Sequence, residues 1–288
     1  MTRAEVPAWA AADPADEVFG VRPLGDDLYF ADRWIDPRRP ETGKTQGRLF
    51  GGEVAARCLA AAQHTVPTGQ AVHSLHGFFL REGTIDLPVR MRVDRPREGR
   101  SFSTRTVVAE QAGNTIFTLT ASFHRAEEGP DDGEPFPAGI EAPETAVHRP
   151  TPFDGYPPRR GFEIVDLLPF TRQPGWVQRR TWVRSRTVLP DAATAHTRVL
   201  THVSDLTTAY AAVLRADLDP SPDITMVASL EHTVFFHRPF RADDWLLIQL
   251  GSPSTHGSRG LVSGTVHSRD GRHVASVVQE ALLRRRRA

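Results

Sequence analysis

The stretch GGEVAARCLAAAQHTV (residues 51–66) is followed closely by VHSLHGFFLR (72–81), and this order of a helix and then a strand decides the fold. Alanine and unbranched side chains favour a helix from Gly51, and Pro67 predicts its end. Three further segments rich in β-branched and aromatic residues, separated by turn residues, predict more strands: PVRMRVDR (88–95), FSTRTVVAEQ (102–111) and TIFTLTASFH (115–124). The first half is therefore expected to be one helix packed against an antiparallel sheet.

The second half repeats this order. Apolar residues recur at helical spacing in SDLTTAYAAVL (204–214), which predicts a helix that starts near Ser204. Four predicted strands follow: MVASLEHTVFFHR (226–238), WLLIQLGS (245–252), GLVSGTVHSR (260–269) and HVASVVQEALL (273–283). Matching order and turn positions indicate a tandem duplication of one α+β unit, in which a long helix is wrapped by a curved antiparallel sheet.

A change in composition separates the two units. Residues 126–160 are dominated by proline, glycine and acidic residues, which is typical of a linker on the surface. We therefore expect a first domain over residues 1–125, including an N-terminal extension, and a second over 161–288.

Charge, cysteine content and the lack of long apolar stretches bear on the partners and the compartment of the protein. Lys plus Arg and Asp plus Glu number 35 each, so no bulk attraction to nucleic acid is expected. The single cysteine, Cys58, lies among small apolar residues and is expected to pack in the core. The first residues lack the apolar region of a secretory signal, and no apolar stretch is long enough to span a bilayer. These observations predict a cytoplasmic protein.

Several stretches in this order resemble the bacterial type II acyl-CoA thioesterases and their peroxisomal relatives. They include LFGGEVAARCLAAAQHTVP (49–67), VHSLHGFFLREG (72–83), VSDLTT (203–208), ASLEHTVFFHRPFRADDWLL (228–247) and VASVVQEALLR (274–284). The resemblance runs from about Arg48 to Arg284. It implies a tandem (double) hotdog fold, hydrolysis of acyl-CoA without a cofactor, and assembly into a homo-oligomer.

The same resemblance implies a catalytic trio. The family's Asp falls on Asp205 in VSDLTT, its Thr or Ser on Ser229 in VASLEHTVFFHRPF, and its Gln on Gln279 in SVVQEALL. The chain departs from the family pattern at Glu231, where Asp is common, and at Phe235, where Trp is common. It also has less bulky residues after VSDLTT, and these departures bear on substrate choice more than on reaction type.

The chemistry of the trio suits a thioester hydrolysed by water. The chain contains no G-x-S-x-G nucleophile elbow, H-E-x-x-H pair or cysteine cluster, so a serine nucleophile and a metal-bound water are both unsupported. Asp205 would act as the base, and Ser229 and Gln279 would each hold the water. Helix N-terminal N–H groups would stabilise the oxyanion.

Each member of the trio also has a structural explanation. An acid at a helix start is favoured by the helix dipole, which would account for Asp205. A strand serine such as Ser229 is usually only hydrogen-bonded. Gln279 shares the apolar face of its strand by alternation and needs a partner there, which a bond across the sheet would supply.

Other polar residues are weaker candidates. Glu53 begins the first helix in a place comparable to Asp205, so it is either a second, degenerate site or an ordinary first-turn acid. Arg81 and Arg238 are either contacts for the phosphates of CoA or paired surface residues. Four strand histidines are expected to be structural: His73, His76, His232 and His237.

Two other functions compete with hydrolysis. A hotdog 2-enoyl-CoA hydratase would need an Asp and a His close together, and VSDLTTAYA contains no histidine. An acyl-CoA-binding protein without activity would have no use for a water site, so the retained Asp, Ser and Gln argue against it.

Overall fold

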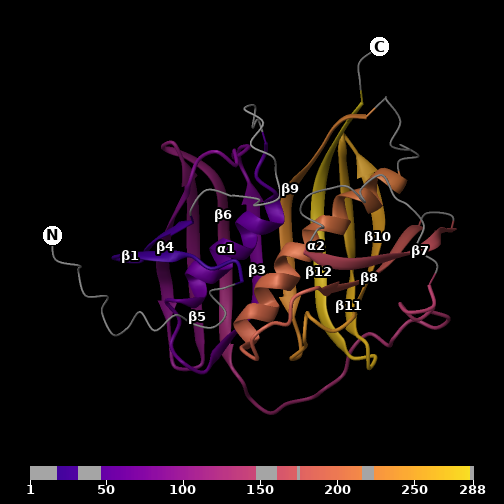
Figure 1. Ribbon diagram of the computed structural model, residues 1–288, viewed down its shortest axis with the longest axis horizontal. Coiled ribbons are helices and arrows are strands. Elements are labelled where there is room, and N and C mark those ends of the chain that lie inside the picture. The colour runs from indigo at the N-terminus through magenta and orange to yellow at the C-terminus, as the bar shows by residue number, and fades with distance from the viewer. Residues whose placement is uncertain (1–17, 32–46, 147–160, 174–175, 216–223, 286–288) are drawn as a thin grey trace.

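The computed structural model describes residues 18–31, 47–146, 161–173, 176–215 and 224–285 (Figure 1). Most of the N-terminal extension and the end of the predicted linker lie outside these ranges. Within these ranges the first half of the chain has one helix and six strands: β1 Arg22–Gly25, β2 Leu28–Ala31, α1 Gly51–Gln63, β3 Gln70–Phe79, β4 Val89–Glu98, β5 Phe102–Gln111 and β6 Asn114–Arg125.

The described residues of the second half also form one helix and six strands: β7 Phe162–Gln173, β8 Trp176–Ser185, α2 Ala193–Arg215, β9 Ile224–Phe236, β10 Leu246–His256, β11 Arg259–Ser268 and β12 His273–Arg285. The strands that the sequence predicts in each half are all present. The short pair β1–β2 and the pair β7–β8 were not predicted. Both lie outside the repeated helix-and-strand order on which the prediction was based.

The twelve strands of the described residues form one antiparallel sheet in the order β1-β2-β4-β5-β6-β3-β9-β12-β11-β10-β8-β7. The six strands of the first half lie on one side of the order and the six of the second half on the other. The halves meet where β3 pairs with β9, from Ser74 opposite Phe235 to Phe78 opposite Glu231. Joining the two edges removes unpaired N–H and C=O groups that each half would otherwise expose.

A tight hairpin joins β5 and β6. Ala112 and Gly113, which the sequence marks as a turn, have φ angles of 47° and 77°. Two consecutive residues with positive φ suit the twist of neighbouring strands, and glycine adopts that conformation without steric cost. The turn keeps Phe117 of β6 opposite Ala109 of β5, where both are buried.

The two helices pack against the sheet and against each other (Figure 1). The alanine-rich α1 buries Ala55, Cys58, Leu59 and their neighbours, because small side chains allow close approach to α2 and the strands. Residues of both helices and both halves of the sheet belong to one continuous apolar core. Cys58 is wholly buried in it, as expected, and burial raises the pKa of its thiol.

The predicted start of the second helix was wrong. We expected it near Ser204, whereas α2 begins at Ala193, so Asp205 lies well inside the helix and does not head it. Polar and apolar residues alternate among the buried ones of the missed part, with Thr197 and Arg198 next to Val199 and Leu200, and this hides the apolar periodicity. Arg198 there is wholly buried and donates from Nε to Oε1 of Gln63 at 2.7 Å.

The described part of the predicted linker, residues 126–146, has no helix or strand but packs on the second half. The indole of Trp182 donates to the carbonyl of Glu141 at 2.9 Å, and Arg238 pairs with Asp131 at 2.6 Å. Phe136 packs against the apolar cluster that contains Trp182. These contacts fix this segment against the sheet.

Candidate active site

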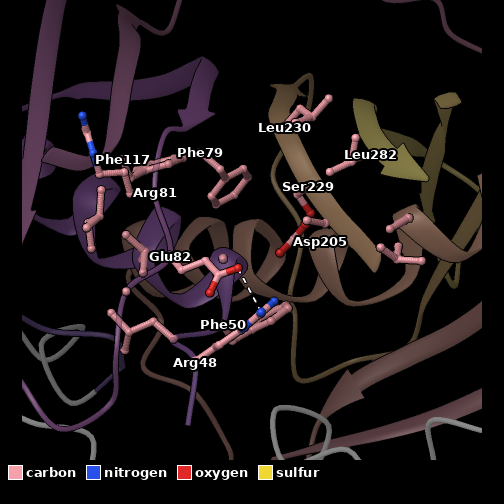
Figure 2. A pocket seen from close by; sticks show the side chains of 18 of the residues that line it. Arg48, Phe50, Phe79, Arg81, Glu82, Phe117, Asp205, Ser229, Leu230 and Leu282 are labelled. Carbon is pink, nitrogen blue, oxygen red and sulfur yellow. Dashed lines mark hydrogen bonds and ion pairs between the residues drawn. The ribbon is translucent and has the colours of Figure 1, made fainter. Parts of the chain in front are cut away.

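A cavity of about 760 Å³ lies between the two halves. Its wall is formed by the N-terminal turn of α1, residues 80–83, the start of β6, one face of α2 and residues 226–230 of β9. Apolar side chains such as Phe79, Ile116 and Val213 supply much of this wall. Two of the three predicted site residues, Asp205 and Ser229, also line it, and they lie side by side in Figure 2.

Asp205 faces the N-terminus of the other helix. It is 6% exposed, and its carboxylate is so close to α1 that a Cβ on Gly51 would lie 3.0 Å from Oδ2. A Cβ on Gly52 would likewise lie 3.0 Å from Cβ of Asp205. Glycines therefore permit this approach, and the positive end of the α1 dipole favours the carboxylate. A helix dipole therefore stabilises the carboxylate of Asp205, but it is the dipole of α1 and not that of α2, the helix to which Asp205 belongs.

Ser229 contacts Asp205 directly. Its Oγ donates a hydrogen bond of 2.8 Å to Oδ1 of the carboxylate. Ser229 is on β9 and Asp205 is on α2, so the contact joins the sheet to the helix that packs on it. The hydroxyl is partly exposed to the cavity, and a molecule in the cavity can reach both residues at once.

Gln279 lies behind Ser229. Its Nε2 donates to Oγ of Ser229 at 2.7 Å, and the side chain is wholly buried on the apolar face of β12, as alternation predicts. Gln279 is absent from the cavity wall. The structure thus brings the three predicted residues together in the order Asp205, Ser229, Gln279. It differs from the expectation that Gln279 itself contacts the water.

His232 extends this hydrogen-bonded chain, which the sequence prediction missed. Its Nδ1 lies 2.6 Å from Oε1 of Gln279 and its Nε2 lies 2.8 Å from Oγ of Ser204. Strict alternation would put His232 and Ser229, three residues apart, on opposite faces. A β-bulge at Leu230 puts both on the inner face, because Gln279 pairs with His232 while Ala281 pairs with Ser229. The bulge carries no sequence signal that we recognised.

The weaker candidates have other partners. The carboxylate of Glu53 is held by Arg57 at 3.0 Å, and Glu53 is not part of the cavity wall. Burial raises the pKa of Glu53 to about 8, although Arg57 acts in the opposite direction. Arg238 pairs with Asp131 of the linker. Arg81 lines the cavity and donates to the carbonyl of Thr115 at 2.8 Å.

The other three histidines that the sequence predicted to be structural form hydrogen bonds to neighbouring strands. His73 bonds Ser122 at 2.8 Å, His76 bonds Glu231 at 2.9 Å and His237 bonds Ser276 at 2.9 Å. Among the described residues, no group of three or more histidines, cysteines or acids is arranged to hold a metal ion. None of the helices in the described ranges is long and apolar enough to cross a membrane.

Two family models match the chain, one in each half. Residues 39–124 match the model described as the acyl-CoA thioesterase N-terminal domain, and residues 165–282 match the model described as acyl-CoA thioesterase. The second match contains Asp205, Ser229 and Gln279.

Curated relatives cover nearly the whole chain. Acyl-coenzyme A thioesterase 8 of Rattus norvegicus is 32% identical over 93% of this chain and 88% of the relative. Acyl-CoA thioesterase 2 of Haemophilus influenzae is 31% identical over 82% of this chain and 88% of the relative.

Solved structures agree in fold. A conserved protein with a hot dog fold from Alicyclobacillus acidocaldarius superposes with a TM-score of 0.74 at 18% identity, covering 95% of this chain and 99% of that one. The protein is thus of the hot dog class. Acyl-CoA thioesterase II TesB2 from Mycobacterium marinum superposes with a TM-score of 0.80 at 34% identity, covering 94% and 98%. The chain belongs to the acyl-CoA thioesterase family.

Proposed function

We propose that this protein hydrolyses the thioester of acyl-CoA with a water molecule activated by Asp205 and aligned by Ser229. The observation that carries the proposal is the bond of 2.8 Å between these side chains on the wall of a largely apolar cavity. Membership of the acyl-CoA thioesterase family supplies the substrate class.

The reaction needs only protein groups and water. The water oxygen attacks the thioester carbonyl carbon while Asp205 accepts a proton from it. The tetrahedral intermediate then collapses, the bond from carbon to sulfur breaks, and the thiolate of CoA leaves and takes up the proton. Ser229 fixes the direction of attack, and Gln279 contributes by holding Ser229.

The oxyanion of the intermediate is stabilised by the first turn of α1. The N-cap residue of this helix, Phe50, makes no side-chain hydrogen bond to it. The first N–H groups of a helix have no carbonyl partner within the helix, so those of Gly51 and Gly52 are available as donors. Gly51 lines the cavity beside Asp205, which supports this role.

The acyl chain lies along α2. Asp205, Ala209 and Val213 follow each other at intervals of four residues, and all three line the cavity. With a rise of about 1.5 Å per residue, Val213 is about 12 Å along the helix from Asp205. This stripe is apolar beyond Asp205 and suits an alkyl chain. Arg81, also on the wall, is available to a phosphate of CoA.

We also propose a division of the chain into domains. The chain is a tandem of two hotdog units, residues 1–125 and 161–288, joined by the linker at 126–160. The division is supported by the helix and six strands that the described residues of each half form, with the strands arranged outward from the β3–β9 pair. We propose further that the enzyme acts in the cytoplasm without a cofactor and, as its family resemblance implies, as a homo-oligomer.

Release of free thiol from a panel of acyl-CoAs of increasing chain length tests the function. Hydrolysis releases stoichiometric CoA and free acid. A hydratase would change 2-enoyl-CoA without releasing thiol, and a binding protein would show saturable binding with no turnover. Absence of thiol release from every acyl-CoA in the panel would overturn the proposal.

A further inference from the structure

We propose that His232 is a positioning residue that fixes the amide orientation of Gln279 and, through Gln279, the direction of the Ser229 hydroxyl. The inference rests on the proposed roles of Asp205 and Ser229 in hydrolysis. His232 is not part of the cavity wall, so it acts on the reaction only through its neighbours.

Four hydrogen bonds connect five side chains in one row. From the cavity inward, the row runs Asp205, Ser229, Gln279, His232 and Ser204, with distances of 2.8, 2.7, 2.6 and 2.8 Å. Gln279, His232 and Ser204 are wholly buried. Water therefore does not compete for these bonds, and each must be satisfied by its neighbours.

The direction of every bond follows from the carboxylate at one end. An ionised carboxylate only accepts, so Ser229 must donate its single hydrogen to Asp205. The Ser229 oxygen can then only accept, so the NH2 group of Gln279 must face it. This leaves the amide oxygen of Gln279 facing His232, and a hydrogen on Nδ1 must fill the gap of 2.6 Å.

The other end of the row is consistent with this direction. Burial lowers the pKa of His232, although the charge of Asp205 acts in the opposite direction, so the ring is favoured as neutral. The oxygen of the Ser204 hydroxyl lies 2.8 Å from Nε2 of His232 and 3.1 Å from the carbonyl oxygen of Thr201. A neutral ring with its hydrogen on Nδ1 has a free lone pair on Nε2, so the hydroxyl can donate its one hydrogen to Nε2, the nearer of the two acceptors. His232 is thus expected as the Nδ1–H tautomer.

Without His232, the orientation of the Gln279 amide would no longer be fixed. An amide can turn over and present its oxygen where its nitrogen had been. With its oxygen toward Ser229, Gln279 would accept the hydroxyl hydrogen that Asp205 now receives. The hydroxyl would then no longer be fixed against the carboxylate, and the attacking water would lose its alignment. His232 therefore keeps Ser229 directed at Asp205.

Nuclear magnetic resonance of the unmodified protein tests the tautomer. Correlation of ring carbon-bound hydrogens with ring nitrogens in histidine-labelled protein identifies which nitrogen carries the hydrogen. The resonances of His232 are assigned by their loss in His232→Asn. We expect the Nδ1–H pattern at neutral pH, and an Nε2–H pattern would overturn the proposal. This measurement does not depend on activity.

Kinetics of His232→Leu test the consequence. We expect kcat to fall about 10- to 100-fold, as for loss of residues that support catalytic groups, with KM changed by less than about twofold. His232→Asn places an amide donor near the position of Nδ1 and should recover most of the lost kcat. The matched control is His196→Leu, because His196 is also buried on a polar contact, to the N–H of Ala242, but lies outside the row. It should leave kcat unchanged.

A double-mutant cycle shows whether His232 acts through Gln279. In a Gln279→Ala background, His232→Leu should cause no further loss of kcat, because the amide it orients is gone. An equal loss in both backgrounds, or an Asn variant as slow as the Leu variant, would overturn the proposal. If Gln279→Ala alone left kcat intact while the tautomer was as expected, the proposed catalytic role of the trio would fail instead.

Discussion

The hydroxyl of Ser229 on β9 donates a hydrogen bond of 2.8 Å to the carboxylate of Asp205 in the middle of α2. These residues are 24 apart in sequence, and their contact lies at the wall of the cavity between the two halves. A base and a hydroxyl in contact, with an apolar cavity in front of them, can hold and deprotonate one water molecule.

Removal of the hydroxyl should slow hydrolysis without abolishing it. A hydrogen bond to a charged group contributes about 1.5–3 kcal/mol, so Ser229→Ala should lower kcat about 10- to 100-fold. Ser229→Thr keeps the hydroxyl and should stay close to the original rate. Ser276→Ala, which removes a strand hydroxyl bonded to His237, is the control and should be neutral. Equal activity of the Ala and Thr variants at position 229 would exclude the hydroxyl from the reaction.

A methyl group at the start of α1 should disturb the site. The Cβ of Gly51→Ala would lie 2.6 Å from Phe79 and 3.0 Å from Oδ2 of Asp205, so side chains must move. A displacement of about 1 Å at a reacting group can lower the rate about 100-fold. We expect a loss of that order in kcat/KM. Gly129→Ala, where a Cβ meets nothing within 4 Å, is the control. An active Gly51→Ala enzyme would contradict the proposed placement of α1.

The stripe on α2 should set chain-length preference. Ala209→Phe fills the cavity between Asp205 and Val213, so it should reduce kcat/KM for long acyl-CoAs far more than for acetyl-CoA. Val213→Phe narrows the cavity farther from the carboxylate and should affect only the longer substrates. A profile of kcat/KM against chain length measures both. Equal loss for all chain lengths would mean that the acyl group lies elsewhere.

Glu53 should give stability an unusual pH dependence. Burial raises its pKa to about 8 from an ordinary value of 4.5, so the folded protein binds a proton that the unfolded chain releases between these values. The stabilising contribution is complete below pH 4.5 and is lost as pH rises to about 8. Relative to Glu53→Gln, the unmodified protein should therefore lose several degrees of Tm over this interval. A constant difference in Tm would show that Arg57 keeps Glu53 ionised throughout.

Local patterns predicted much of the sheet. Alternation correctly put Gln279 on the buried face of β12, and the pair Ala112-Gly113 correctly marked a hairpin. Such features depend on neighbours in sequence. The resemblance predicted Asp205 and Ser229 as site residues, and the structure shows that they touch.

Features that depend on distant contacts could not be predicted in this way. The start of α2 was missed because residues such as Arg198 are polar and yet buried, where Gln63 of the other helix satisfies them. His232 was missed because a bulge at Leu230 changes which side chains of β9 face inward. In both cases a contact with a segment distant in sequence decides which side chains are buried, and the periodicity of the local sequence does not show it.

The most direct test of the account is turnover by Asp205→Asn, with Tm measured on the same preparation. Asn keeps the shape of the side chain and an oxygen that can accept from Ser229, but it cannot take a proton from water. Loss of a general base lowers rates about 100- to 10,000-fold, so kcat should fall within that range while KM and Tm change little. Near-unchanged turnover of acyl-CoA by this variant would remove Asp205 from the mechanism and contradict the account.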